Sequence, residues 1–483
     1  MPVLGIDIGT RSLKALVLGD DLRVLGSDSC RYEPTFPQAG WAEQDPALWL
    51  AALRPAIGEA IANAGLSRID ITALAICGQL DGCVPTARDG SALGPALIWM
   101  DRRGEAEIAH IDPDLVHARC GLVRDATHMG GKIAWLGKRF AHRGEVAIWH
   151  QPVSFIVAAL TGRAVMARSL ASTTMLYDLA GRGWDPELVA AFGTTVERLP
   201  ELAEASEIAG QLTTAGADLT GLPAGLPVAV GTGDDFSNPL GCGVCRPGIV
   251  AVSLGTAETV AALAERPILD AERLVETHAY PGGLYHLGNP GWLSGGAVRW
   301  ASALLGIASD EAFSALAAEA PPGSDGVLFI PALTGAMAPK WIAGARGSFL
   351  GLDASHTRAH LARAVLEGTA FAMRDVVDRL DALGVPTDRL RIMGGGARSR
   401  LWCEIRSAVT ARPAEVLTSS DASALGAALL ALVVAGRSPD VATAAAALPL
   451  ELTEVEAPPD TRYEAAHARY RETFAALEPT WRG

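Results

Sequence analysis

Two stretches of similar pattern lie about half a chain apart, GIDIGTRSLKALVL at 5–18 and AVSLGTAETVAALA at 251–264. Each runs from an apolar segment through Gly-Thr and a short polar turn into a second apolar segment, which predicts a β-hairpin. One such unit in each half of a 483-residue chain predicts two domains with related cores. The glycines and proline of GVCRPG mark the break between them, so we expect domains at 1–245 and 246–483.

Strand-like and helix-like segments alternate in the first half. Apolar runs predict strands at 3–9, 13–19, 22–32 and 71–78. Before the last of these, residues 43–65 carry apolar side chains at helical spacing, with Asp45 as N-cap and Pro46 in the first turn. This alternation, in a chain that is 49% hydrophobic and 19% charged, is typical of a globular α/β protein.

The net charge indicates which kinds of molecule the chain can bind, and the cysteine content indicates its cellular compartment. The net charge of −14 argues against nucleic acid, because no broad basic surface would neutralise its phosphates. The seven scattered cysteines favour reduced thiols in a cytoplasmic protein over a disulfide framework.

Cys242 and Cys245 form a CGVC pair that is either a redox or zinc half-site or two small packing residues. No basic leader opens the chain and the apolar segment 424–435 is too short to cross a bilayer, so we expect no membrane partner.

The two Gly-Thr turns offer backbone N–H groups and hydroxyls to an anion. One turn is usually only a hairpin, whereas Gly9-Thr10 and Gly255-Thr256 facing each other could clamp one polyphosphate between the domains. Asp7 stands just before the first turn on an apolar strand, where an unpaired carboxylate is costly. Asp7 therefore either hydrogen-bonds the turn or holds a hydrated Mg²⁺ beside the phosphates.

A run of three glycines, in MGGGARSRLW at 393–402, follows the strand-like LRI. A glycine turn between a strand and a helix lets the backbone approach a flat or anionic ligand. The run is neither a dinucleotide-binding fingerprint nor a Walker A loop. It either holds an adenosine or makes a tight connection from strand to helix.

Two pairs of polar residues end apolar segments. In GQLDG, Gln79 and Asp81 are placed to hydrogen-bond sugar hydroxyls, although Asp-Gly is also a common turn signal. In GTGDD, Asp234 and Asp235 follow a short apolar run. One could be a general base that takes a proton from an alcohol, and the other the N-cap of a helix that begins at FSNPLG. The local chemistry does not decide between the two aspartates.

Together these motifs resemble the FGGY family of carbohydrate kinases, from Gly5 to about Ala435. GIDIGTRSLKAL is similar to the first phosphate motif of the family, SLGTAETV to the second, and IMGGGARSRLW to the adenosine motif. WAEQDPALWL and IWMDRRG are further family-like segments. GSFLGLDASHTRAHLARAVLEG resembles the C-terminal signature, with the expected spacing of His360, Ala364 and Glu367.

The resemblance implies two domains of the actin, Hsp70 and hexokinase type (ribonuclease H-like), with the active-site cleft between them. The N-terminal domain would bind the sugar and the C-terminal domain the nucleotide. Two hinged domains closing over the sugar would exclude water and limit ATP hydrolysis. Within the family, the chain looks most like the xylulokinases.

The family transfers the γ-phosphoryl group of ATP to a sugar hydroxyl with Mg²⁺, and the resemblance implies the same roles here. Asp234 matches the catalytic base, and Asp7 matches the aspartate that holds the metal through water. The implied substrate contacts are Gln79, Leu80, Asp81 and Asp235. The implied nucleotide contacts are Thr10, Arg11, Gly255, Thr256, Gly394, Gly395, Gly396 and Ser399.

The sequence departs from the xylulokinase pattern mainly around the substrate. Leu80-Asp81 stand where Met-His is usual, and Asp235 stands where Asn is usual. GAMAPKW replaces a segment that normally contains Glu-Arg, and Thr127 and Met129 are off the pattern of the mid-chain signature. Two added carboxylates would repel sugar acids and favour neutral polyhydroxy compounds.

We therefore expect an ATP-dependent kinase of a xylulose-like pentulose. Ribulose, a deoxy-ketose, glycerol and erythritol are alternative substrates of the same chemistry. A nucleotide-binding or sugar-sensing protein of the same fold without transferase activity is a third hypothesis, and the retention of Asp7 and Asp234 argues against it. The expected partners are ATP, ADP, Mg²⁺ and a neutral sugar or polyol, with a homodimer left open.

Overall fold

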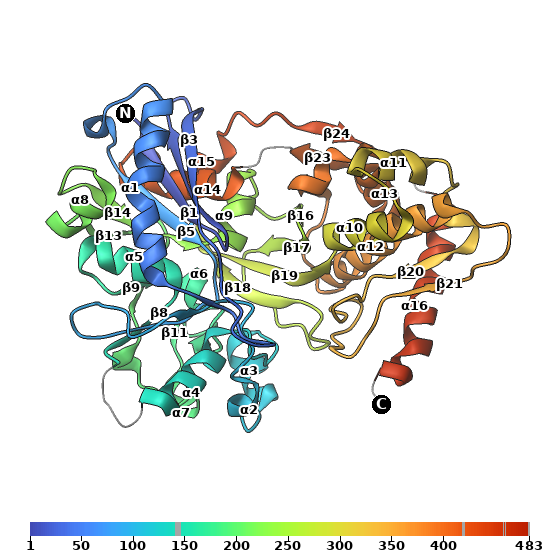
Figure 1. Cartoon of the computed structure of the whole chain (residues 1–483), viewed down its shortest axis with the longest axis horizontal. Coiled ribbons are helices and arrows are strands. Elements are labelled where there is room, and N and C mark those ends of the chain that lie inside the picture. The colour runs from blue at the N-terminus through green and yellow to red at the C-terminus, as the bar shows by residue number, and fades with distance from the viewer. Residues whose placement is uncertain (141–145, 418–420, 457, 459, 482–483) are drawn as a thin grey trace.

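Two seven-stranded sheets, one in each half of the chain, form the framework of the molecule (Figure 1). The computed structural model describes residues 1–140, 146–417, 421–456, 458 and 460–481. The first sheet has the order β13-β14-β5-β1-β2-β3, with β15 also paired to β5. The second has the order β18-β19-β17-β16-β22-β23-β24.

The strands of the first sheet are β1 Val3–Ile8, β2 Ser12–Leu18, β3 Val24–Arg31, β5 Leu74–Gly78, β13 Ile208–Gln211, β14 Pro227–Ala229 and β15 Thr232–Gly233. Those of the second are β16 Ile249–Leu254, β17 Ala257–Ala264, β18 Glu276–Tyr280, β19 Leu284–Leu293, β22 Arg389–Met393, β23 Ala414–Leu417 and β24 Thr453–Val455. Short two-stranded sheets pair β4 Glu43–Gln44 with β7 Ala96–Leu97, β6 Val84–Thr86 with β8 Ile148–His150, β9 Val165–Ala167 with β12 Glu201–Ala203, β10 Tyr177–Asp178 with β11 Gly183–Trp184, and β20 Leu328–Ile330 with β21 Ser348–Leu350.

The helices of the first half are α1 Pro46–Asn63, α2 Glu105–Ile108, α3 Pro113–Cys120, α4 Met129–Phe140, α5 Pro152–Thr161, α6 Arg168–Ala171, α7 Pro186–Ala191, α8 Thr214–Thr220 and α9 Asp234–Gly241. Those of the second half are α10 Gly295–Leu305, α11 Asp310–Ala318, α12 Arg358–Ala382, α13 Arg400–Thr410, α14 Ala422–Val434, α15 Val441–Ala446 and α16 Thr461–Trp481. The predicted cap of α1 is confirmed, because the Asp45 side chain accepts a hydrogen bond of 2.9 Å from the Ala47 N–H.

The two sheets share a local arrangement around their Gly-Thr turns. β1 is antiparallel to β2 and parallel to β5, and in the same way β16 is antiparallel to β17 and parallel to β22. The repeat in the sequence is therefore a repeat of structure. The predicted α/β class is confirmed.

Helix α14 belongs to the second half in sequence but lies against β1, β2, β5 and α9 of the first half (Figure 1). Glycines permit this approach of backbone to backbone. A Cβ atom on Gly5 would lie 2.0 Å from the Ala424 carbonyl oxygen, and one on Gly426 would lie 2.0 Å from the Ser237 carbonyl oxygen. The helix α14 is apolar and buried, and it covers one face of the first sheet. Its side chains join the two halves of the chain into one hydrophobic core.

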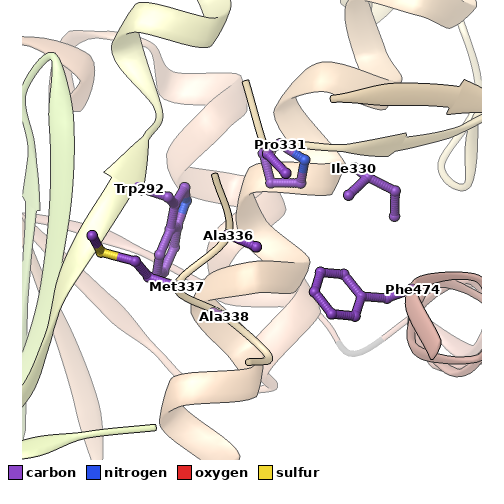
Figure 2. A pocket seen from close by; sticks show the side chains of 8 residues that line it. Trp292, Ile330, Pro331, Ala336, Met337, Ala338 and Phe474 are labelled. Carbon is purple, nitrogen blue, oxygen red and sulfur yellow. The ribbon is translucent and has the colours of Figure 1, made fainter. Parts of the chain in front are cut away.

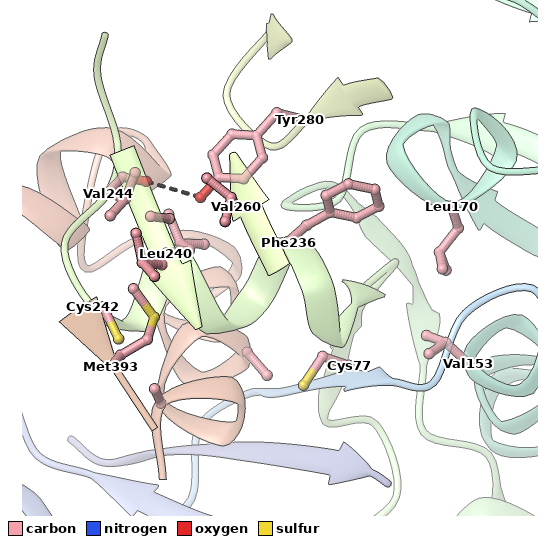
Figure 3. Close-up of a cluster of buried hydrophobic side chains, with 14 of the residues drawn as sticks. Cys77, Val153, Leu170, Phe236, Leu240, Cys242, Val244, Val260, Tyr280 and Met393 are labelled. Carbon is pink, nitrogen blue, oxygen red and sulfur yellow. Dashed lines mark hydrogen bonds between the residues drawn. The ribbon is translucent and has the colours of Figure 1, made fainter. Parts of the chain in front are cut away.

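Helix α9 packs at the centre of this core. Figure 3 shows Phe236 and Leu240 of α9 between β5 and the second sheet, with Cys242 just beyond the helix end. The Tyr280 hydroxyl of β18 donates a hydrogen bond of 2.8 Å to the Val244 carbonyl (Figure 3). No helix among the described residues is long and apolar enough to span a membrane.

We expect Gly426→Ala to destabilise the protein by about 1–3 kcal/mol, because the new methyl group would overlap the Ser237 backbone. Gly137→Ala is the matched control, since it is also helical and its nearest neighbour would lie 3.9 Å away. The control should keep or raise stability. Thermal and urea unfolding measure both variants, and an unchanged midpoint for Gly426→Ala would contradict the packing described for α14.

Candidate active site

The carboxyl ends of three neighbouring parallel strands meet in the first sheet. In β5, Cys77 is in register with Asp7 of β1 on one side and with Thr232 of β15 on the other. The chain leaves β5 into Gln79 and leaves β15 into Asp234. Ligands of open α/β sheets bind at this edge. The register therefore brings together Asp7, the loop that starts at Gln79 and the helix that starts at Asp234, which the sequence indicated as three separate motifs.

The two adjacent aspartates both lie in the first turn of α9. The helix begins at Asp234 and its N-cap residue is Gly233, so the alternative in which one aspartate caps a helix beginning at FSNPLG is wrong. The Asp235 N–H donates a hydrogen bond of 3.1 Å to Asp234 Oδ1. Carboxylates are stabilised at a helix N-terminus by the helix dipole, and neither side chain is used as the cap.

Burial and like charges make these carboxylates unusually basic. Asp234 is half-buried. Desolvation raises its pKa well above the usual range, and the neighbouring Asp235 and Asp7 raise it further. Asp235 is open to solvent, yet the protein atoms around it and the charge of Asp81 raise its pKa to about 6. A carboxylate with a raised pKa is a better proton acceptor than an ordinary aspartate.

Asp7 lies on β1, opposite Lys14 of β2 on one side and Cys77 of β5 on the other. Its Oδ1 atom is buried and has no hydrogen-bond partner among the described residues. Burial raises the pKa of Asp7 to about 6, against the opposing effects of the Lys14 charge and a hydrogen bond with Cys77. A buried carboxylate oxygen without a partner fits a hydrated divalent cation, for which oxygen is the preferred ligand.

The loop after β5 carries the three remaining substrate candidates. Asp81 is buried in the left-handed backbone region, at φ 60°, and its N–H donates to Gln151 Oε1 at 2.9 Å. Leu80 packs against Gly233, since a Cβ atom on that glycine would lie 3.0 Å from Leu80 Cδ2. Gln79 Nε2 donates to Gln44 Oε1 at 2.7 Å. Leu80 therefore lies beside the residue that precedes Asp234, and the charge of Asp81 acts on Asp235, whereas the Gln79 amide nitrogen is engaged within the protein.

Three side chains that sequence reasoning did not assign lie around Asp81, namely Gln151, His128 and Lys132. A fourth, Glu276, lies against His128. His128 Nδ1 lies 3.4 Å from Asp81 Oδ2. Lys132 is fully buried, and burial lowers its pKa to about 8 against the opposing charge of Asp81. The carboxylate of Asp81 is thus partly neutralised, which weakens the electrostatic argument against sugar acids.

The first Gly-Thr turn is held by side chains from three segments, one of which is Tyr32, whose hydroxyl donates to the Gly9 carbonyl at 2.8 Å. Gln44 Nε2 donates to the Thr10 carbonyl at 2.7 Å, and Trp99 Nε1 donates to Thr10 Oγ1 at 3.1 Å. Because Gln44 in turn accepts from Gln79, the loop after β5 and this turn share one hydrogen-bonded chain. Arg11, next to the turn, is exposed.

The second Gly-Thr turn and the glycine turn lie side by side. Gly255 and Thr256 are exposed, and Arg299 of α10 donates to Thr256 Oγ1 at 2.8 Å. Gly394 has φ 89°, and a Cβ atom there would lie 2.8 Å from the Leu254 carbonyl. The turn continues through Gly395 and Gly396 into α13. Glycine is thus required where β22 passes the end of β16.

Ser399, a predicted nucleotide contact, has a structural role as well. Its Oγ atom accepts from the Trp402 N–H at 3.3 Å and so caps α13, and it also hydrogen-bonds Ser314 at 2.8 Å. Beneath these turns Glu258 of β17 and Arg406 of α13 form a fully buried ion pair of 2.5 Å. The pair ties the second Gly-Thr hairpin to the helix that follows the glycine turn.

Other candidate features offer no chemistry. The apolar pocket of Figure 2, lined by residues such as Trp292, Met337 and Phe474, leaves no room for a water molecule. It includes part of the divergent GAMAPKW segment. Cys242 and Cys245 are buried free thiols, and no group of three or more metal-ligating side chains occurs among the described residues. Both cysteines pack in the core.

Comparison with known proteins identifies the class that this fold and site define. The model of the N-terminal domain of the FGGY family of carbohydrate kinases matches residues 2–241, and that of the C-terminal domain matches residues 250–435. The chain belongs to the FGGY family and is a carbohydrate kinase with the actin- and hexokinase-like fold. The hypothesis of a protein without transferase activity is thereby set aside.

Individual relatives include both sugar and polyol kinases. The chain is 30% identical to a xylulose kinase of Escherichia coli, covering 98% of each sequence. It is 33% identical to a glycerol kinase of Gloeobacter violaceus, covering 93% of this chain and 91% of the relative. The crystal structure of xylulose kinase from Rhodospirillum rubrum superposes with a TM-score of 0.91 at 31% identity, over 100% of both chains.

We expect Arg406→Met to lower stability by roughly 3–5 kcal/mol, because it leaves Glu258 buried without a counter-charge. Adding Glu258→Gln to that variant should restore part of the loss. Arg400→Met is the control, since the Arg400–Glu404 pair on the same helix is exposed and such pairs contribute less than about 1 kcal/mol. Thermal unfolding measures all three, and equal losses for Arg406→Met and Arg400→Met would refute the role of the buried pair.

Proposed function

We propose that the enzyme transfers the γ-phosphoryl group of ATP to a hydroxyl of a neutral sugar, with D-xylulose, giving D-xylulose 5-phosphate and ADP, as the first candidate. The observation that carries this proposal is the basic Asp234 carboxylate at the N-terminus of α9, beside Asp7, Asp235 and the substrate loop. Relatives that match 98% of the chain and are named xylulose kinase support the choice of sugar.

The chemical step follows from the positions of these groups. Asp234 accepts the proton of the substrate hydroxyl as its oxygen bonds to the γ-phosphorus, and the bond from that phosphorus to the β,γ-bridging oxygen breaks to release ADP. Phosphoryl transfer depends mainly on positioning and on stabilising charge. The N–H groups at the start of α9 favour the negative charge of the group in transfer.

The nucleotide would be held by the backbone of the turns. Thr10 and Arg11 of the first turn and Gly255 and Thr256 of the second would contact the phosphates. Gly394, Gly395, Gly396 and Ser399 would line the adenosine site. Asp7 would hold Mg²⁺ through water, and that ion would supply positive charge to the phosphates.

The substrate pocket would be formed by Leu80, Asp81 and Asp235. Carboxylates accept hydrogen bonds from sugar hydroxyls, which favours a neutral polyhydroxy compound. Glycerol is the second candidate because glycerol kinases are 31–33% identical over most of this chain. Ribulose and erythritol also present hydroxyl groups that can donate hydrogen bonds.

We also propose a cytoplasmic location, supported by the seven free cysteines, and a homodimer stays a prediction.

A coupled assay of ADP release tests the substrate class with D-xylulose, ribulose, glycerol, erythritol and gluconate. We expect turnover with a neutral compound, and Asp234→Asn should lower kcat about 10²- to 10⁴-fold, because the general base is lost, without abolishing nucleotide binding. The exposed Asp21→Asn is the control. Full turnover by Asp234→Asn would contradict its role as base, and a preference for gluconate would contradict the neutral substrate.

The pH profile tests the basicity of Asp234. Because only the ionised form accepts a proton, kcat/KM should rise with pH through the pKa of Asp234, well above the ordinary value of about 4. Asp235→Asn removes a like charge and should move this acidic limb to lower pH. An acidic limb that does not move would show that the charge of Asp235 has no effect on the base.

A further inference from the structure

His128 lies between two carboxylates that come from opposite halves of the chain. Its Nδ1 atom is 3.4 Å from Asp81 Oδ2 in the substrate loop, and its Nε2 atom is 3.5 Å from Glu276 Oε1 on β18. All three residues are buried, with His128 5% and Glu276 2% exposed. A histidine placed in this way among carboxylates carries a positive charge.

The charged groups around His128 identify it as the cation of this cluster. Asp81 and Glu276 raise the pKa of His128 well above its usual range despite its burial. His278 Nε2 also faces Glu276, at 3.8 Å, but burial lowers the pKa of His278. Lys132, one turn into α4, donates a hydrogen bond to the Thr127 carbonyl rather than to a carboxylate.

Glu276 is fixed firmly enough to hold the histidine in place. Its Oε1 atom accepts from the Val123 N–H at 2.8 Å. The next residue, Thr277, donates its N–H to the Gly121 carbonyl at 3.0 Å. Strand β18, at the edge of the second sheet, is thus bound to the first half (Figure 1).

Asp81, in contrast, has acceptor capacity to spare. Its Oδ1 atom makes no hydrogen bond within the part of the chain that the structure describes, and its contact with His128 is the 3.4 Å ion pair through Oδ2. The charge of Asp81 reaches Asp235, whose pKa it raises. Asp81 therefore lies close enough to Asp235 for their charges to interact, and the neighbouring His128 and Lys132 offset that repulsion.

We propose that His128 is a positioning residue for the substrate: its ring, held between Asp81 and Glu276, keeps the Asp81 carboxylate in place to accept hydrogen bonds from the substrate. The proposal rests on the proposed function, in which Asp81 contacts the sugar. Without the His128 ring, the Asp81 carboxylate would lose the side chain that fixes its orientation as an acceptor. Sugar binding would weaken, whereas the nucleotide contacts lie on other turns.

A double-mutant cycle on the substrate that the wild-type enzyme phosphorylates tests this inference. We expect His128→Gln to raise KM for the sugar about tenfold or more, the effect of one hydrogen bond to a charged group, with KM for ATP changed less than about twofold. Asp81→Asn should also raise KM for the sugar, and the double variant should be no worse than Asp81→Asn alone. His150→Gln is the control, since His150 is equally buried but faces Ser154 rather than a carboxylate.

An unchanged KM for the sugar in His128→Gln, or additive effects in the cycle, would overturn the proposal while leaving the kinase activity in place. A lack of turnover by the wild-type enzyme with every sugar would instead refute the proposed function. Should His128→Gln fail to fold, Glu276→Gln takes its place, and its KM for the sugar should begin to rise at a lower pH than in the wild-type enzyme, because His128 loses one of the two carboxylates that raise its pKa.

A nuclear magnetic resonance titration of the histidine ring nitrogens gives a readout independent of turnover. The His128 signal should stay that of an imidazolium well above pH 6.5 in the wild-type enzyme and titrate lower in Asp81→Asn. A neutral His128 at pH 7 in the wild-type enzyme would refute the proposal.

Discussion

The register of three parallel strands places the acids of this kinase. Cys77 in β5 lies opposite Asp7 on one side and Thr232 on the other, so the chain emerges from β5 and β15 at the same level of the sheet. A shift of one residue would turn each side chain to the opposite face. The hydrogen-bond ladder therefore fixes where α9, which starts at Asp234, and the loop after β5 begin.

Carboxylates that lie together at one sheet edge repel one another, and the surrounding structure neutralises some of them more than others. Asp81 has His128 and Lys132 nearby, and the helix dipole of α9 favours Asp234 and Asp235. Asp7 keeps a buried oxygen without a partner in the described chain. The carboxylates whose charge is least neutralised by the protein are Asp234 and Asp7, to which the proposed chemistry assigns a proton and a cation.

Local patterns in the sequence were sufficient to predict those elements whose structure depends on residues close by in the chain. The two hairpins, the cap at Asp45 and the strand–turn–helix around Gly394 all follow from turn chemistry and apolar spacing. The surroundings of Asp81 do not follow from such patterns, because His128 lies 47 residues later in the chain and Glu276, which contacts His128, lies 195 residues later. No periodicity or motif links such residues. The start of α9 was also missed, since glycine at the N-cap gives a weak signal beside two aspartates.

The position of α14 has a consequence for biosynthesis. The strands of the first sheet are complete at Gly233, yet the helix that covers one of their faces ends at Val434. At translation speeds of about 5–20 residues per second, the ribosome makes the intervening stretch of about 200 residues in roughly 10–40 s. During that interval an apolar sheet face is uncovered in the nascent chain, which makes it a binding surface for chaperones. The first half of this kinase thus completes its fold only when most of the second half has been made.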